Sequence, residues 1–195
     1  MITLASASAA RASLLKAAGV AFEVATSGVD ETQTKDRLLA EGSTPAEIAG
    51  ALAEAKAVAV SKSMGGLVIG ADQTLEFEGA LYDKAASLGE AKARLRTLRG
   101  RTHRLHAAVV TARDGRRLWG ETITSTLTMR DFSDDFLEGY VDRNPDAALW
   151  SVGCYELEGE GIQLFEHIDG DYFAILGLPL TGLLAHLREE GLVPQ

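Results

Sequence analysis

The sequence predicts an α/β protein with a mixed central sheet, flanking helices and two lobes around a cleft. Two observations carry this prediction. Apolar strand-like runs alternate with helix-forming segments along the chain, and residues 67–71 form a continuous apolar run, typical of a strand buried on both faces. With 46% hydrophobic residues and neither repeats nor a flexible linker, we expect one domain over residues 1–195.

Small residues delimit the first strand and helix. Residues 2–5 are apolar and indicate a buried strand, and residues 9–18 are rich in helix-forming Ala and Leu. Ser6 or Ser8 suits the N-cap of this helix, and Gly19 suits its end.

A second strand is expected at residues 21–25, followed by a loop over residues 26–31. Two helices should follow, at residues 32–40 and 45–61. The second of them begins at Thr44-Pro45, which combines a capping hydroxyl with a first-turn proline.

After the buried strand, residues 74–82 indicate a hairpin, and residues 87–98 an amphipathic helix that ends at Gly100. The sequence Arg113-Asp114-Gly115 predicts a turn between two long strands rich in β-branched residues. The remaining strands are expected at residues 102–111, 118–129 and 161–168. The remaining helices are expected at residues 133–140 and 179–190.

Charge and composition exclude several classes of function. A formal net charge of −9 should repel polyanions, so we expect no nucleic-acid partner, although a local cationic cluster can still bind a small anion. Cys154 is the only cysteine, which agrees with a reducing compartment. No apolar run reaches 18 residues and no secretory signal is found, so we expect a cytoplasmic protein without membrane contact.

Two chain segments could carry chemistry on their own. Ser8 and Arg11 follow the first strand at a helix N-terminus, where an anion could bind, but a capped helix with a surface arginine is the simpler interpretation. Asp72 directly follows the buried strand, where a carboxylate can hold a cation or accept a proton from water. A turn-capping aspartate explains Asp72 equally well.

Other polar and aromatic residues have ordinary interpretations when each is taken alone. Glu31, Lys56 and Lys84 suit solvated surface positions, although together they would let acids hold a metal and bases hold phosphate. The histidines lack zinc-ligand spacing, and no phosphate-binding glycine loop or nucleophile elbow is present. Cys154 is expected to be inert, and Trp119 and Trp150 are expected to pack in the interior.

Several short motifs, each weak when taken alone, follow one another in a defined order along nearly the whole chain. The motifs are Leu4-Ala5-Ser6-Ala7-Ser8-x-x-Arg11-x-x-Leu14-Leu15, Val29-Asp30-Glu31, Leu52-Ala53-x-x-Lys56-Ala57, Ile69-Gly70-Ala71-Asp72, Lys84, Gly100-Arg101-Thr102-His103, Gly170-Asp171-Tyr172 and Leu176-Gly177-Leu178-Pro179-Leu180. In this order they resemble the Maf nucleotide pyrophosphatases, also called septum-formation inhibitor proteins, which have a Maf/ITPase-like fold.

The resemblance implies hydrolysis of a nucleoside triphosphate to the monophosphate and pyrophosphate, with a divalent cation, Mg²⁺ or Mn²⁺, as cofactor. It implies that Asp72 is the catalytic base or a metal-bound acid and that Glu31 helps to hold the ion. The triphosphate would be bound by a serine and three basic residues, Ser8, Arg11, Lys56 and Lys84.

Departures from the family pattern bear on the substrate. The pair Asp72-Gln73 and the residue Glu158 resemble the branch that acts on 7-methyl-GTP, in which a carboxylate can accept from the N–H donors of guanine. Gln73, Glu158 and Ala10 are therefore candidate substrate-binding residues. Ala10 stands where that branch has an aromatic residue.

Two further departures leave an alternative function open. Ala12 replaces a second arginine and Ser151 a basic residue of the family pattern, so a catalytically weakened, nucleotide-binding regulator of cell division is the alternative. A protein-interaction module of cell division is a third hypothesis, but no exposed apolar helix or peptide groove is evident in the sequence. A homodimer is expected from the frequency of such assemblies.

Overall fold

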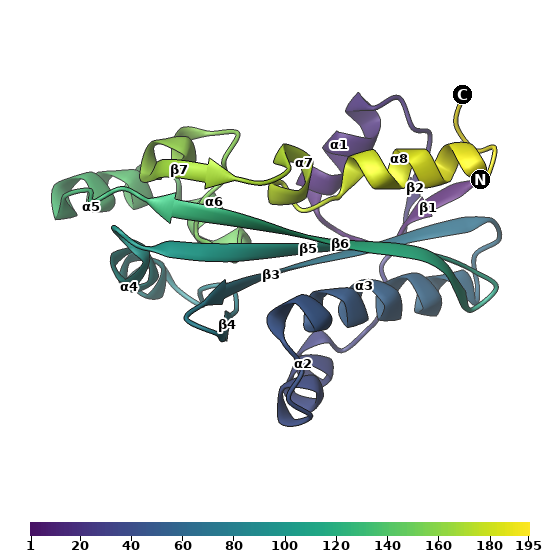
Figure 1. The fold of residues 1–195 in the computed structure, drawn as a ribbon, viewed down its shortest axis with the longest axis horizontal. Coiled ribbons are helices and arrows are strands. Elements are labelled where there is room, and N and C mark those ends of the chain that lie inside the picture. Colours follow the sequence, from purple (N-terminus) through teal and green to yellow (C-terminus); the bar gives the residue numbers. More distant parts are fainter.

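A single seven-stranded sheet runs along the length of the molecule in the computed structural model, which describes residues 1–195 (Figure 1). The strand order is β2-β1-β3-β5-β6-β7, with β4 paired to β3. The strands are β1 (Ile2–Leu4), β2 (Glu23–Val24), β3 (Leu67–Phe77), β4 (Ala80–Tyr82), β5 (Thr102–Arg113), β6 (Arg116–Met129) and β7 (Phe165–Asp169). Pairings of β1 with β2 and β3 are parallel and the others antiparallel, so the sheet is mixed, as predicted.

Helices cover both faces of this sheet. In Figure 1, α3 lies below the sheet and α1 and α8 lie above it, while α4, α5 and α6 gather at the far end. The helices are α1 (Ala9–Ala17), α2 (Glu31–Ala40), α3 (Pro45–Ser61), α4 (Leu88–Leu98), α5 (Asp134–Arg143), α6 (Pro145–Trp150), the 3₁₀ helix η1 (Glu160–Leu164), α7 (Tyr172–Ile175) and α8 (Leu180–Glu189). No helix is both long and apolar enough to span a bilayer.

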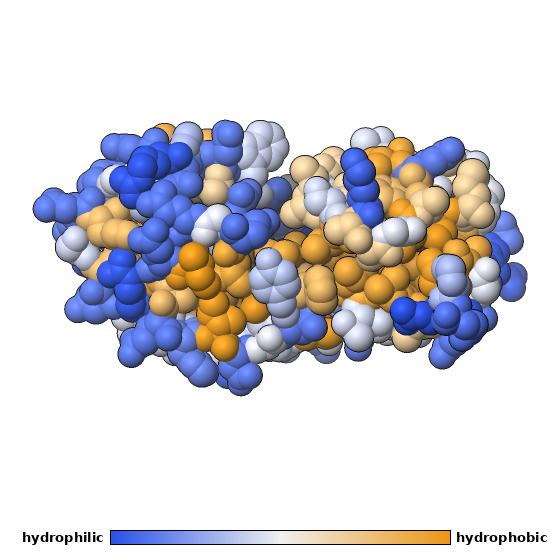
Figure 2. Space-filling view, turned by 90° about the horizontal axis from the view of Figure 1, so that it is seen from above, coloured by the Kyte–Doolittle hydropathy of each residue, from blue (hydrophilic) through white to orange (hydrophobic).

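Two hydrophobic cores account for the expected two lobes, which Figure 2 shows as two masses separated by a notch. Leu67, Ile69 and Ala71 of β3 belong to the core under α1 and α8. Leu75 and Phe77, farther along the same strand, belong to the core under α4 and α5. Strand β3 therefore joins the lobes, and the boundary between them falls at its middle.

The middle of β3 has an open edge. Strand β5 covers one edge of β3 almost throughout, but on the other edge β1 pairs only with residues 67–69 and β4 only with residues 75–77. Asp72 and Gln73 lie in the gap between these two short partners. Because successive side chains of a strand point to opposite faces, these two residues are presented to different sides of the sheet.

Helix α3 lies unusually close to β3. A Cβ atom on Gly70 would come within 2.2 Å of the Ala53 carbonyl oxygen, so only glycine permits this approach. Ala49, Ala53 and Ala57 give α3 a small-residue face against the sheet. Thr44 caps the helix through a capping box, as its sequence signal predicts. This close packing brings Lys56 over β3.

The structure differs from the predicted elements at several places. Strand β3 continues through Phe77, so the predicted buried strand and the first arm of the hairpin are one element. The strand predicted at residues 161–168 begins as the helix η1, and β2 comprises only two residues of the predicted 21–25. Asp30 caps α2, so Glu31 is the first residue of that helix and not part of a loop. Helices α6 and α7 were not expected.

Candidate active site

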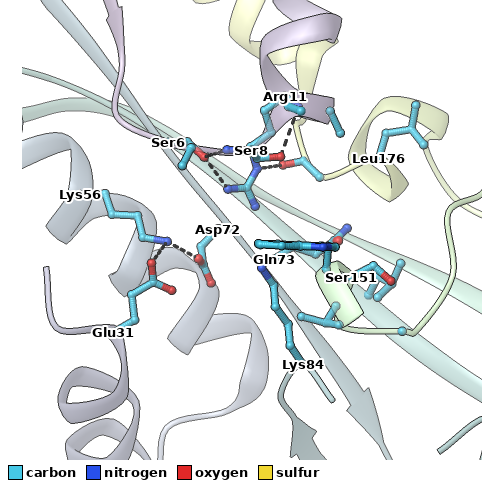
Figure 3. A pocket seen from close by; sticks show the side chains of 18 of the residues that line it. Ser6, Ser8, Arg11, Glu31, Lys56, Asp72, Gln73, Lys84, Ser151 and Leu176 are labelled. Carbon is cyan, nitrogen blue, oxygen red and sulfur yellow. Dashed lines mark hydrogen bonds and ion pairs between the residues drawn. The ribbon is translucent and has the colours of Figure 1, made fainter. Parts of the chain in front are cut away.

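A cavity of about 830 Å³ opens at the uncovered edge of β3, between the lobes. It is lined by the β1–α1 loop, the start of α2, the middle of α3 and β3, the turn after β4, and the segment that follows α6. All nine residues predicted for the site line this cavity: Ser8, Ala10, Arg11, Glu31, Lys56, Asp72, Gln73, Lys84 and Glu158. Figure 3 shows the charged side chains among them converging from different elements.

A three-residue charge cluster forms the inner wall of the cavity. The Lys56 ammonium lies 2.6 Å from Asp72 Oδ1 and 2.8 Å from Glu31 Oε1. The side chains of Lys56 and Asp72 are only 7% and 9% exposed, whereas that of Glu31 is 45% exposed. One ammonium thus bridges two carboxylates, which would otherwise repel each other beside a buried strand, and the cluster keeps one net negative charge.

Arg11 closes the open edge of β3. Its Nη1 donates to the Ala71 carbonyl oxygen at 2.8 Å and to Ser6 Oγ at 3.1 Å, and its Nε donates to the Gly177 carbonyl oxygen at 2.8 Å. Burial lowers the pKa of Arg11, while the negative charges of Asp72 and Glu31 oppose that change. Nη2 makes no hydrogen bond to the chain and remains available to a ligand.

Ser8 is the N-cap of α1, and its Oγ accepts from the Arg11 backbone N–H at 3.4 Å. The capping interpretation of this serine is therefore correct. The accompanying expectation of a surface arginine is wrong, because the Arg11 side chain is half-buried and held by backbone carbonyls.

Gln73 lines the cavity and also bonds to the chain itself. Its amide nitrogen donates to the carbonyl oxygens of Ala174 and Ile175, at 3.1 and 2.9 Å. Both amide hydrogens are thereby committed to α7. The side chain ties the C-terminal segment to β3 and has no N–H left for a substrate, whereas its Oε1 is not used in these two bonds, and the predicted substrate contact stays a prediction.

Two further lysines, Lys84 and Lys35, complete the cationic lining. Lys84 is exposed and forms no ion pair or hydrogen bond with the chain. Lys35 pairs with Asp83, the neighbour of Lys84. Sequence analysis missed Lys35, although its position four residues after Glu31 places both on one face of α2.

The segment after α6 forms the outer wall, with Glu156 and Glu158 exposed to the cavity region. Loss of hydrating water raises the pKa of Glu156, and the charges of Glu158 and Asp146 raise it further. Trp150 ends α6 and is 70% exposed at the same cavity, so the expectation that it packs in the interior is wrong.

His103, His106 and Trp119, which were expected to be structural, do not line the cavity. His103 bonds to the Tyr155 hydroxyl at 2.6 Å, His106 bonds to Thr124 and Glu76, and Trp119 stacks on His186. These contacts agree with structural roles.

The donor set can be tested against a divalent cation. No group of three or more His, Cys, Asp or Glu side chains is gathered anywhere in the chain. Asp72 and Glu31 nevertheless share one partner at the cavity wall. Mg²⁺ typically takes one or two carboxylates and completes its shell with water and substrate phosphate oxygens, so this pair fits such an ion when a phosphate is bound.

Comparisons with known proteins extend over almost the whole chain. The family model described as "Maf-like protein" matches residues 1–190. A protein of Caulobacter vibrioides named nucleoside triphosphate pyrophosphatase is 61% identical, covering 97% of this chain and 96% of its own. Proteins named 7-methyl-GTP pyrophosphatase from Brucella abortus biovar 1 and Rhizobium meliloti are 48% and 46% identical, covering 97% and 99% of this chain and 96% and 98% of their own. The chain therefore belongs to the Maf-like protein family.

Proposed function

We propose that this chain is a nucleoside triphosphate pyrophosphatase that uses a divalent cation and prefers a guanine-type, 7-methylated nucleotide. The observation that carries the proposal is the Lys56–Asp72–Glu31 cluster, in which Lys56 and Asp72 are buried and which faces a cavity with further cationic side chains. Full-length relatives named for this activity support the reaction class.

In the proposed reaction, water attacks the α-phosphorus and the bond to the bridging oxygen of the β-phosphate breaks. Asp72 accepts the proton of the water, and pyrophosphate leaves with the electrons of the broken bond. Lys56 holds the Asp72 carboxylate in a fixed position through the 2.6 Å contact. Asp72 and Glu31 would hold the divalent ion, which would supply charge neutralisation at the phosphates.

The cationic residues have separate tasks in this proposal. Arg11 offers Nη2 to a phosphate oxygen, because its other donors are occupied by the chain. Lys84 approaches from the opposite wall and carries a free ammonium. Cations on two sides would stabilise the negative charge that builds on the leaving pyrophosphate.

The segment after α6 is the proposed site of the base. Glu158 and Glu156 offer acceptors for the N–H donors of guanine. Trp150 supplies an exposed aromatic face at the same cavity, which compensates for the alanine at position 10. A cationic 7-methylated base is attracted to both the carboxylates and the indole face.

The alternative of an inactive regulator finds no support in this geometry. The carboxylate pair, the lysine between them and the free Lys84 are all in place. Cytoplasmic location, the absence of a nucleic-acid partner and a homodimeric state stay predictions.

Pyrophosphate release from a nucleotide panel tests the proposal. The panel contains 7-methyl-GTP, GTP, dTTP and UTP, each with Mg²⁺, with Mn²⁺ and with a chelator. The expected result is turnover only with metal and the highest kcat/KM for 7-methyl-GTP. Binding without turnover for every nucleotide would overturn the enzymatic proposal, and equal kcat/KM values would overturn the base preference.

A further inference from the structure

Arg94 is a buried cation that lies outside the cavity and has no part in the proposed reaction. It sits on α4 with a side chain only 7% exposed. Its Nη1 donates to two backbone carbonyls, that of Asp83 and that of Val152, the latter at 3.0 Å. Burying a guanidinium is costly unless its donors are satisfied, so a specific arrangement of acceptors must surround it.

The two acceptors belong to different walls of the cavity. Asp83 directly precedes Lys84, the free ammonium of the phosphate side. Val152 follows Trp150 and Ser151 in the segment proposed for the base. One guanidinium nitrogen thus bonds to the backbone of both segments, which lie far apart in the sequence.

Further contacts reinforce this junction. Arg94 Nη2 bonds to Glu90 Oε1 at 3.1 Å, and Glu90 Oε2 accepts from the Ala86 backbone N–H at 2.9 Å. The guanidinium also lies over the Tyr82 ring, 5.4 Å from its centroid. Ala86 and Tyr82 flank Lys84, so the turn is tied to α4 both through Arg94 and directly through Glu90.

Cys154 lies at the same junction. Burial raises the pKa of this thiol to about 11, and the nearby Arg94 charge and the Ala85 backbone N–H oppose the rise. The thiol therefore stays neutral near pH 7, and it is buried beside Arg94 and Ala85.

We propose that Arg94 is a positioning residue that sets the spacing between the phosphate-binding turn around Lys84 and the base-binding segment of residues 150–158. This inference rests on the proposed function, because it assumes that one nucleotide contacts both segments. Arg94 does not line the cavity, and it acts on the two segments through the backbone of Asp83 and Val152.

The proposal has a consequence that a purely structural role would not have. A nucleotide that contacts both segments gains from their fixed spacing, since its second contact forms within an already bound ligand. Inorganic tripolyphosphate contacts only the phosphate side and cannot gain in this way. Loss of Arg94 should therefore weaken nucleotide binding far more than tripolyphosphate binding.

The test compares Arg94→Met with the wild type by calorimetry, using 7-methyl-GTP with a non-cleavable methylene bridge between the α- and β-phosphorus, and tripolyphosphate. We expect the nucleotide Kd to rise about tenfold or more and the tripolyphosphate Kd to change less than about twofold. Arg96→Met is the matched control, because Arg96 lies on the same helix but is 42% exposed and pairs only with Asp134 and Glu138. It should leave both Kd values unchanged.

The outcomes separate this inference from the proposed function. Equal changes of both Kd values in Arg94→Met, or no change, would overturn the positioning role alone. A wild type that binds neither probe, or binds the nucleotide no more tightly than tripolyphosphate, would overturn the proposed function and the inference with it. If Arg94→Met does not fold, Arg94→Lys, which keeps the charge and one donor, is judged by the same comparison.

Discussion

Substitution of Gly70 by alanine should displace helix α3, and with it Lys56 of the active site. The added Cβ would lie 2.2 Å from the Ala53 carbonyl oxygen and 2.6 Å from the Ala57 backbone nitrogen, both on α3. Ordinary contacts begin at 3.4 Å, so the backbone of α3 must retreat by about 1 Å. Lys56 neighbours Ala57 and would move away from Asp72 with the helix.

The size of the effect follows from this displacement. Overpacking of a core typically costs about 1–3 kcal/mol, and we expect the upper part of that range because backbone atoms must move. A misplacement of about 1 Å in a catalytic arrangement costs on the order of 100-fold in rate. Urea denaturation measures the free energy of unfolding, and pyrophosphate release measures kcat.

Gly50→Ala provides the control on the same helix. A Cβ at Gly50 would meet only Thr122 Oγ1, at an ordinary 3.6 Å, so alanine should stabilise α3 by about 0.5–1 kcal/mol and leave kcat unchanged. A Gly70→Ala protein with wild-type stability and kcat would refute the argument that close packing of α3 on β3 sets the position of Lys56.

Three further predictions concern the site and its surroundings. Asp72→Asn should lower kcat by about 10²–10⁴-fold while nucleotide binding by calorimetry persists, and full activity would refute its role as the base. Trp150→Ala should raise KM for 7-methyl-GTP by about fivefold and hardly change KM for UTP, since a cation–π contact contributes about 1 kcal/mol; equal changes in KM would exclude stacking. Burial lowers the pKa of His103 from 6.5 to about 4, so unfolding takes up a proton between these values. The free energy of unfolding should therefore fall by about 3 kcal/mol as pH decreases from 6.5 to 4, and His103→Gln should lose this part of the pH dependence.

Elements with local start and stop signals were predictable from the sequence. Thr44 caps α3 where the Thr44-Pro45 signal predicts, and the helices predicted to start at Ser87 and Ser133 begin directly after these residues, which cap them. Helices α6 and α7 have only six and four residues, too few to establish a helical period, so they depend on tertiary packing. The apolar residues of η1 resemble a strand because short apolar runs do not distinguish strand from helix.

The site was predictable where it depends on strand ends and motif order. Asp72, Glu31 and Lys56 were expected near one another, and the structure brings them into contact, while their roles stay predictions. The contacts of Gln73 and Arg94 could not be predicted, because their partners are backbone carbonyls distant in the sequence. Every residue has a backbone carbonyl, so a contact to it does not constrain which residue type stands at that position.

Gln73 connects two parts of the cavity wall. Its amide reaches the carbonyls of α7 and thereby holds the loop whose Gly177 carbonyl accepts from Arg11. Gln73 thus fixes the wall behind Arg11, while our proposals assign base discrimination to the segment with Trp150 and Glu158 and the spacing of that segment from Lys84 to Arg94.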